Sequence, residues 1–315
     1  MESVAVIGAG VAGLTTAVVL VERGYRTAIL AEQVGPGTTS FAAAAIWYPY
    51  DIRPAAKAIP WALQTYQRLL RLAEDLKTGV SMLELRRYAR TGEIEIPAWA
   101  LPLGAVRLQY DIPPAFASGF SLNVPLMDTS IYLDYLEQRF RKAGGEIHLR
   151  LFHKLEEIDP GFELIVNCTG IGARALLPDL DLEPHRGQVA VVTKADQRLG
   201  TVCEEPPLTY IIPRRNDCVF GGTNDLSDNL AIDPITTARV VTECSRVLGI
   251  KKPTVLAERV GLRPFRRSGV RLERTRSADG RRVIHNYGHG GAGFTISWGC
   301  AETVALLARV LGSVL

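Results

Sequence analysis

A glycine-rich segment near the start of the chain has the residue types and spacing of a site for dinucleotide phosphates. It reads Gly8-Ala9-Gly10-Val11-Ala12-Gly13, which matches G-x-G-x-x-G. Such glycines permit a tight turn, let the backbone approach a pyrophosphate and let a helix pack closely on a strand. Glu32 follows 19 residues after Gly13, where a carboxylate can accept hydrogen bonds from a ribose. The motif alone does not distinguish NAD from FAD.

The segments around this motif predict the elements that would position it. Ser3–Ile7 and Arg26–Ala31 are short apolar runs typical of buried strands, and the apolar Val11–Glu22 has the length of a helix. A helix that begins at Val11 presents free backbone N–H groups and a partial positive charge to bound phosphates. The start of the chain therefore predicts a dinucleotide-binding βαβ unit.

Apolar periodicity, glycine and proline divide the rest of the chain into further elements. We expect helices at 60–76, 128–143, 236–248 and 293–311. We expect strands at 147–151, 164–167, 188–193, 210–212 and 218–221, a strand-like stretch at 80–126 and three strands within 256–287.

This order of elements predicts an α/β protein with two interleaved domains. One is a Rossmann-like cofactor domain, and the other is a mostly antiparallel, β-rich domain for substrate binding and interfaces. We expect the first to comprise 1–76, 128–190 and 276–315, and the second to comprise 77–127 and 191–275.

The composition is that of a soluble globular protein, with 315 residues, a net charge of +3 and 22% charged residues. A surplus of positive charge this small argues against nucleic acid or a membrane surface as the partner. No apolar run reaches the roughly 18 residues of a membrane span. The chain opens on a strand pattern and does not end in a peroxisomal signal, so we expect a cytoplasmic protein.

The cysteines are odd in number and widely spaced, at Cys168, Cys203, Cys218, Cys244 and Cys300. No Cys-x-x-Cys pair occurs, and the five histidines do not complete a ligand set with them, so we expect no metal site. Most should be buried thiols. Cys203 and Cys218 flank an expected hairpin, which leaves one disulfide open.

Two downstream segments favour FAD over NAD. Ile165-Val166-Asn167-Cys168-Thr169-Gly170 is a strand that ends in Thr-Gly, and it resembles the second nucleotide-contacting strand of glutathione-reductase-like flavoproteins. Residues 286–295 (NYGHGGAGFT) bring a glycine-rich turn to the start of the last helix. A helix N-terminus there could stabilise negative charge on the pyrimidine end of a reduced flavin.

Over nearly its whole length the chain resembles the D-amino-acid oxidases. The resemblance rests on seven segments: 8–13, 38–50 (TTSFAAAAIWYPY), 165–170, 186–188 (RGQ), 210–213 (YIIP), 261–264 (GLRP) and 283–299 (VIHNYGHGGAGFTISWG). It implies a homodimeric flavoenzyme that oxidises D-amino acids to imino acids and passes electrons to O₂. Hydrolysis of the imino acid then gives a 2-oxo acid and ammonia, and hydrogen peroxide is released.

The resemblance also implies roles for particular residues. Arg263 pairs with the substrate carboxylate through its two-pronged guanidinium, the Tyr210 hydroxyl adds a hydrogen bond, and the Gly291 carbonyl accepts from the amine. Hydride transfer from Cα to flavin N5 then requires positioning and no side-chain base. His285 and His289 are expected to hold the C-terminal loop.

The cofactor contacts that the resemblance implies are spread along the chain. They are Gly8, Ala9, Gly10, Val11, Ala12, Gly13, Glu32, Gln33, Thr38, Thr39, Ser40, Ala45, Ile46, Phe152, Gly170, Arg263, Gly290, Gly291, Ala292, Gly293, Phe294 and Thr295. Animal members of the family carry Asp-Arg where this chain has Glu32-Gln33, so the adenine loses a stacking guanidinium here.

Two further departures from the family concern the substrate. The segment 204–209 before Tyr210 predicts a short, proline-stiffened lid, so product release should depend less on lid opening. D-aspartate oxidases carry an arginine where this chain has Asn224, which favours neutral or apolar D-amino acids.

Several alternatives stay open. Trp47, Tyr48, Tyr50 and Ile212 are expected pocket walls. A D-aspartate oxidase or glycine oxidase of the same fold is the nearest alternative function. An NAD-dependent dehydrogenase and a non-enzymatic flavin module are more distant ones.

Overall fold

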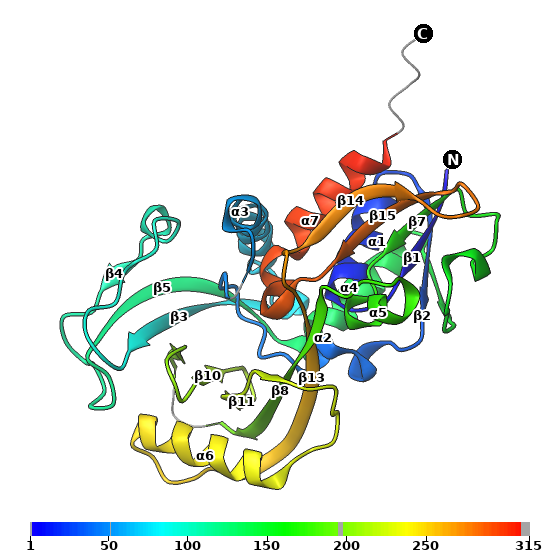
Figure 1. Cartoon of the computed structure of the whole chain (residues 1–315). Coiled ribbons are helices and arrows are strands. Elements are labelled where there is room, and N and C mark those ends of the chain that lie inside the picture. Colours follow the sequence, from blue (N-terminus) through cyan, green and yellow to red (C-terminus); the bar gives the residue numbers. More distant parts are fainter. Residues whose placement is uncertain (1, 51, 195–197, 310–315) are drawn as a thin grey trace.

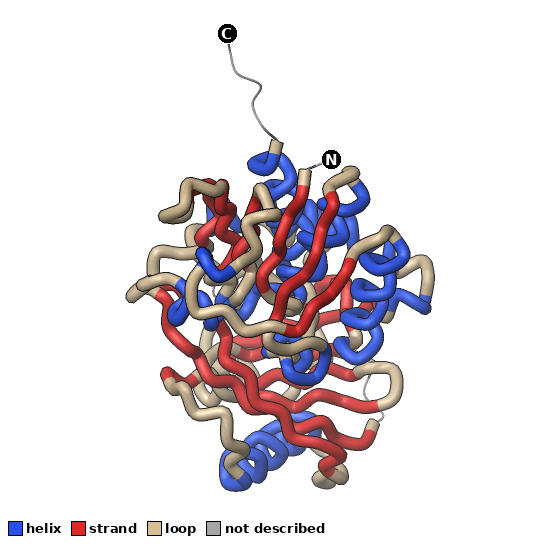
Figure 2. Tube along the Cα trace, turned by 90° about the vertical axis from the view of Figure 1, so that its right-hand side faces the viewer, coloured by secondary structure: helices blue, strands red, loops and turns tan. Residues whose placement is uncertain are grey.

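The protein is built on two β-sheets that share one chain in an interleaved order. The computed structural model describes residues 2–50, 52–194 and 198–309. Figure 1 shows α1, α4 and α7 beside one sheet and α6 on the far side of the other. Figure 2 shows the sheets as an upper and a lower layer. The expected α/β class is thereby confirmed.

The six-stranded sheet has the order β14-β15-β7-β1-β2-β6. Its strands are β1 (Ser3–Ile7), β2 (Arg26–Ala31), β6 (Glu146–Leu149), β7 (Leu164–Asn167), β14 (Arg271–Arg276) and β15 (Arg282–Tyr287). All pair in parallel except β14 with β15. Both β1 and β7 are buried along their whole length, as expected for central strands of a parallel sheet covered on both faces.

Four longer helices accompany this sheet. They are α1 (Val11–Glu22), α3 (Ala55–Leu72), α4 (Thr129–Lys142) and α7 (Gly293–Ala308). Because α1 and α7 are apolar on most of their surface, they pack against one another inside the main core. At Gly299 on α7 an added Cβ would lie 2.3 Å from the Trp61 carbonyl oxygen, so this glycine lets α3 and α7 approach closely.

The nine-stranded sheet has the order β12-β8-β11-β10-β9-β3-β5-β4, with β13 also paired to β8. Its strands are β3 (Val80–Ala89), β4 (Val106–Arg107), β5 (Ser118–Met127), β8 (Leu182–Thr193), β9 (Gly200–Cys203), β10 (Thr209–Pro213), β11 (Asp217–Gly221), β12 (Asp225–Leu226) and β13 (Val255–Arg266). Only β3 with β9 is parallel among its described pairs. Helix α6 (Pro234–Leu248) covers one face with an apolar core of its own.

Most predicted elements are confirmed, and the differences have local causes. The helix expected at 60–76 starts at Ala55 and ends at Leu72, because Pro60 lies within the helix rather than at its first turn. Asp128 accepts a hydrogen bond from the Ser130 N–H and so caps α4 as expected. The strand expected at 188–193 begins at Leu182, since Pro184 and Gly187 do not end it.

The short elements were missed. They are α2 (Thr39–Ala42), α5 (Ala173–Leu176), β9 and β12, and each has no more than four residues. The last helix ends at Ala308, and the remainder of the expected 293–311 helix beyond 309 lies outside the described residues.

The predicted domain limits can be compared with the sheets. The limit at 190 falls inside β8, which pairs in the nine-stranded sheet over 182–193. The limit at 275 falls inside β14, which belongs to the six-stranded sheet. Sheet membership would place these limits at the start of β8 and after β13. The division into two domains itself stays a prediction.

All five cysteines are buried free thiols. The disulfide left open between Cys203 and Cys218 does not form, because β10 lies between the strands that carry them. Burial raises the pKa of the Cys218 thiol to about 12. Among the described residues, no group of three His, Cys, Asp or Glu side chains could hold a metal ion, and no helix is long and apolar enough to span a membrane.

A buried carboxylate ties the two sheets together near the C-terminal loop. One oxygen of Asp179, whose side chain is 6% exposed, accepts from the Tyr287 hydroxyl at 2.6 Å and from Arg266 Nε at 2.9 Å. Tyr287 ends β15 and Arg266 ends β13. Burial opposes ionisation, but the hydrogen bonds from Tyr287 and Arg266 outweigh it and lower the pKa of Asp179.

Asp179→Asn should therefore lower the free energy of unfolding by about 1–3 kcal/mol at neutral pH, because the charge-assisted bonds are lost. The pKa of Asp179 is lowered in the folded protein, so the contribution of this residue is full above its unfolded pKa and is lost as the pH falls through the folded value. Urea unfolding of both proteins between pH 7 and pH 3 measures this. A difference that grows toward low pH would contradict it.

Candidate active site

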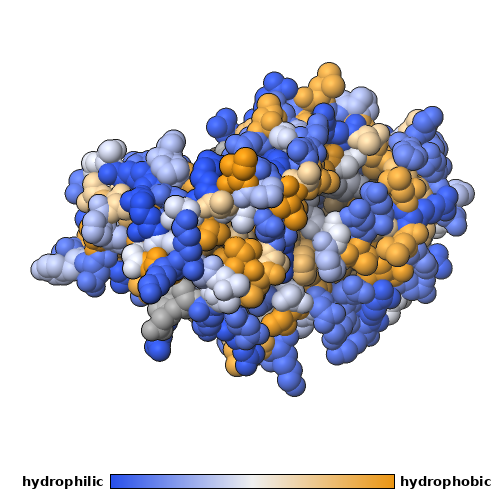
Figure 3. Space-filling view, turned by 90° about the horizontal axis from the view of Figure 1, so that it is seen from below, coloured by the Kyte–Doolittle hydropathy of each residue, from blue (hydrophilic) through white to orange (hydrophobic). Residues whose placement is uncertain are grey.

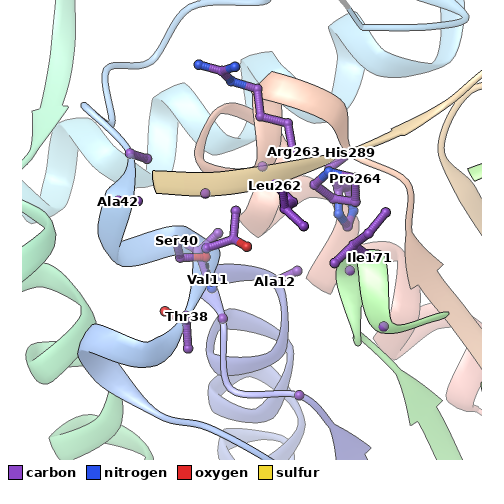
Figure 4. A pocket seen from close by; sticks show the side chains of 18 of the residues that line it. Val11, Ala12, Thr38, Ser40, Ala42, Ile171, Leu262, Arg263, Pro264 and His289 are labelled. Atoms are coloured by element: carbon purple, nitrogen blue, oxygen red, sulfur yellow. Dashed lines mark hydrogen bonds between the residues drawn. The ribbon is translucent and has the colours of Figure 1, made fainter. Parts of the chain in front are cut away.

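A cavity of about 800 Å³ runs between the two sheets. It reaches from the turn after β1 to the face of the nine-stranded sheet that is turned away from α6. Figure 4 shows Val11, Thr38 and Ser40 at one end, and the Arg263 side chain extending from β13 away from them. The cavity therefore has a glycine-loop end and an arginine end.

The glycine-loop end is shaped by close backbone packing. Gly8 has φ +105°, a left-handed conformation that favours glycine. A Cβ on Gly13 would lie 1.9 Å from the Gly8 carbonyl oxygen, so only glycine fits there. Ser40 Oγ accepts from the Val11 N–H at 2.9 Å and brings α2 against the start of α1. Within the described chain, no backbone acceptor is found for the Ala12 and Gly13 N–H groups, which suits a phosphate.

A second group of lining residues follows β2 and β6. Glu32 and Gln33 come directly after β2, and Phe152 comes from the segment whose Arg150 N–H donates to the Ala31 carbonyl at 2.8 Å. The Arg150 guanidinium lies 4.9 Å from the centre of the Phe152 ring and also lines the cavity. Sequence reasoning noted the missing arginine after Glu32 but missed Arg150. Its position two residues before Phe152 was the available signal.

The C-terminal turn closes the middle of the cavity. Gly290, Gly291, Gly293 and Phe294 line it where α7 begins. The Thr295 hydroxyl instead donates to the Tyr48 carbonyl at 2.9 Å and accepts from the Tyr48 N–H, so its side chain anchors the 45–48 segment on α7.

The two C-terminal histidines, His285 and His289, are buried and contact neighbouring polar side chains. Nε2 of His289 lies 3.0 Å from Asn286 Oδ1, and burial lowers the pKa of His289 to about 4. His285 is also buried, with its pKa lowered to about 4 by burial, and contacts Thr275 outside the cavity lining. Both are therefore neutral near pH 7.

The arginine end is built on two glycines of the nine-stranded sheet. A Cβ on Gly187 would lie 2.5 Å from both terminal nitrogens of Arg263, and one on Gly221 would lie 2.0 Å from the Tyr210 ring. The Arg263 guanidinium and the Tyr210 ring therefore lie over positions that have no side chain. Neither arrangement could form over any other residue without a shift of the side chain above it.

Hydrogen bonds fix the Arg263 guanidinium in this place. Nη1 donates to the Thr223 carbonyl at 2.9 Å and to Asn224 Oδ1 at 3.1 Å, and Nη2 donates to the Tyr210 hydroxyl at 3.3 Å. Burial raises the pKa of Tyr210 and the charge of Arg263 opposes that rise, so the phenol is neutral and can donate its proton. The pair offers N–H and O–H donors to an anion.

Twenty of the predicted site residues line this one cavity. They are Gly8, Ala9, Gly10, Val11, Ala12, Glu32, Gln33, Thr38, Thr39, Ser40, Ala45, Ile46, Phe152, Gly170, Tyr210, Arg263, Gly290, Gly291, Gly293 and Phe294. Gly13, Ala292 and Thr295 are not in the lining. Of the expected walls, Tyr48, Tyr50 and Ile212 line the cavity, whereas Trp47 is fully buried and donates to the Ala62 carbonyl. The roles of all these residues stay predictions.

Comparison with known proteins gives the family. Residues 3–307 match the model of the DAO family of FAD-dependent oxidoreductases, and the chain belongs to this family. It is 39% identical to a D-amino-acid oxidase of Rubrobacter xylanophilus (96% of this chain, 94% of that protein). It is 40% identical to one of Streptomyces coelicolor (97% and 96%) and 32% identical to a human D-aspartate oxidase (96% and 94%).

Solved structures agree on the fold. A glycine oxidase from Geobacillus kaustophilus superposes with a TM-score of 0.82 over 98% of this chain and 95% of that one, at 18% identity. The predicted cofactor, FAD, is confirmed by the family. The glycine cradle, the unpartnered N–H groups at the start of α1 and the long cavity all fit a dinucleotide.

Gly13→Ala should weaken FAD binding by about 100-fold or more, because the methyl group would force the start of α1 away from the Gly8 carbonyl. Titration of apoprotein with FAD, followed by flavin fluorescence, measures the dissociation constant. Gly161→Ala is the control, since that glycine is exposed, outside the cavity and clear of positive φ. Equal affinities for the two variants would contradict the cradle assignment.

Proposed function

We propose that the protein oxidises neutral or apolar D-amino acids to imino acids with O₂ as the electron acceptor. The observation that carries the proposal is the Arg263–Tyr210 pair, which offers N–H and O–H donors to a carboxylate at the end of the cavity remote from the glycine loop. The names of the relatives, at about 40% identity over nearly the whole chain, support it.

Each part of the substrate has a group that would hold it. Charge-assisted bonds from Arg263 bind the carboxylate, and each contributes roughly 1.5–3 kcal/mol. The Gly291 carbonyl, just before α7, would accept a hydrogen bond from the substrate amine. FAD, when bound, would supply the two-electron oxidising chemistry, as acceptor of the hydride from the substrate Cα and donor of electrons to O₂.

The proton balance needs no side-chain base. The substrate nitrogen loses a proton as Cα loses a hydride, and O₂ takes up two electrons and two protons to give hydrogen peroxide. Water then adds to the imino acid and ammonia leaves, giving a 2-oxo acid. Within the described lining, His289 is neutral and bonded to Asn286. Glu32 and His153 belong to the segments after β2 and β6, which lie side by side because the Arg150 N–H donates to the Ala31 carbonyl. Residues of this chain therefore act by positioning.

Asn224 supports a neutral substrate over an acidic one. Its side-chain oxygen accepts from Arg263 and brings no positive charge to the cavity. The alternatives, D-aspartate oxidation and glycine oxidation, are separated from the proposal by peroxide release with D-alanine, D-aspartate and glycine. Faster oxidation of D-aspartate or glycine than of D-alanine would overturn it.

Arg263→Lys should lower kcat/KM for D-alanine by about 10- to 100-fold, because lysine keeps the charge and loses the two-pronged geometry. The FAD content should be retained. Steady-state peroxide assays measure the effect, and unchanged kinetics would remove Arg263 from the substrate site.

Gly221→Ala should lower kcat/KM by about tenfold or more, because the methyl group displaces the Tyr210 ring. The effect should vanish in a Tyr210→Ala background, where no ring remains to be displaced. The four enzymes of this cycle are compared by the same assay. Fully additive losses would show that Gly221 acts by another route.

The contacts of segment 204–209 support the expectation of a short, stiff lid. Glu205 accepts from the Arg90 N–H at 2.6 Å, Arg90 donates to the Pro207 carbonyl at 2.7 Å, and Leu208 lines the cavity. Turnover should then be insensitive to solvent viscosity. A rate that falls in proportion to added sucrose viscosity would contradict this.

We extend the proposal to a homodimer on the resemblance to the family, and a cytoplasmic location stays a prediction from the sequence. Figure 3 shows hydrophobic residues among hydrophilic ones on the lower face of the molecule. Light scattering of the purified protein would give the mass of two chains, and the mass of one chain would contradict the dimer.

A further inference from the structure

An ion pair lies directly behind one wall of the cavity. Nη2 of Arg87, on β3, lies 3.1 Å from a carboxylate oxygen of Glu204, just after β9, and the side chains are 13% and 35% exposed. Arg87 Nε donates to the Tyr48 hydroxyl at 3.3 Å, and Nη1 donates to the Tyr88 carbonyl at 2.7 Å. Tyr48 lines the cavity, so the guanidinium is one side chain away from its interior.

Strand register places Arg87 on the same sheet face as Tyr210. Arg87 is directly opposite Val202 on β9, and Val202 is directly opposite Tyr210 on β10. Directly opposed residues share a face, and adjacent strands are about 4.8 Å apart, so the backbones of Arg87 and Tyr210 are about 10 Å apart. Val202 also lines the cavity. A substrate side chain that extends from the proposed carboxylate site past Val202 would approach Arg87.

The backbone next to Glu204 is held in place. The Glu205 carboxylate accepts from the Arg90 N–H, and Arg90 also pairs with Glu243 of α6 at 3.1 Å. Glu204 is therefore attached to a fixed segment, and its charge stays beside Arg87.

The charges of Arg87 and Glu204 cancel each other beside the cavity. Arg87 contributes a positive charge and Glu204 a negative one. The Tyr48 phenol is neutral, since burial and the nearby Glu204 raise its pKa. The oxygen of that phenol accepts from Arg87, which leaves its proton to donate to a group in the cavity.

We propose that the Arg87–Glu204 pair sets the selectivity of the enzyme for the charge of the substrate side chain. Glu204 cancels the attraction that Arg87 would otherwise exert on an acidic side chain, so the cavity prefers neutral side chains that reach Tyr48. This inference rests on the proposed oxidation of D-amino acids, and it assigns the determinant to a pair remote from the carboxylate site.

The test compares D-glutamate with D-glutamine, which have equal shape, and adds D-lysine as a positively charged substrate. In Glu204→Gln the ratio of kcat/KM for D-glutamate to that for D-glutamine should rise about tenfold, because Arg87 is no longer compensated. In Arg87→Met the remaining Glu204 should instead raise the preference for D-lysine over D-glutamine. In the double variant both ratios should return toward the wild-type values.

Glu84→Gln is the matched control. Glu84 pairs with Arg86 at 2.9 Å on the same strand, and Arg86 lies on the opposite face from Arg87. Its substitution should leave both ratios unchanged. Ratios in Glu204→Gln and Arg87→Met that match this control would overturn the inference.

A binding measurement separates this inference from the proposed function. Glutarate and butyrate are titrated into each holoprotein, and their binding in the cavity is followed by the change in the visible spectrum of FAD. The titrations give a dissociation constant for each acid. If the wild type oxidises no D-amino acid, the proposed function fails, whereas the glutarate-to-butyrate affinity ratio still decides the role of the pair. An unchanged affinity ratio in Glu204→Gln contradicts it.

Discussion

The Arg263 guanidinium can lie on the face of the nine-stranded sheet only because position 187 has no side chain. In the same way, the Tyr210 ring can lie over the neighbouring strand β11 because Gly221 has no side chain there. Because Gly187 and Gly221 have no side chains, the Arg263 guanidinium and the Tyr210 hydroxyl can lie flat on the sheet and form one end of the cavity. Without these glycines the strands would still pair, but neither donor group could occupy its present place. The position of both hydrogen-bond donors in the cavity therefore depends on glycine at positions 187 and 221.

The Arg263 and Tyr210 donors can serve a substrate only if the six-stranded sheet and its helices hold the rest of the cavity at a fixed distance from them. Asp179 contributes to this because it joins the end of β13, which carries Arg263, to the end of β15, which leads into the C-terminal turn. Thr295 adds a second connection, from α7 to the backbone of Tyr48. Both connections are short and buried, and they place the two sheets around one cavity.

Sequence reasoning predicted the parts of this design that have local signatures. The βαβ unit follows from three glycines, two apolar strands and Glu32, and the N-cap of α4 follows from Asp128. It could not predict what depends on register between distant strands. The hollow under Arg263 requires Gly187 and Arg263 to be near neighbours across β8 and β13, 76 positions apart. Val202 and the Arg87–Glu204 pair were missed for the same reason.

The proposed reaction requires the cavity to orient a D-amino acid by its carboxylate for hydride loss. The most direct test is anaerobic mixing of the FAD-loaded protein with D-alanine, L-alanine, D-aspartate or glycine, followed by the flavin absorbance. We expect rapid bleaching with D-alanine, slower bleaching with D-aspartate and glycine, and none with L-alanine. Bleaching by L-alanine at the rate seen with D-alanine, or by none of the four, would contradict it.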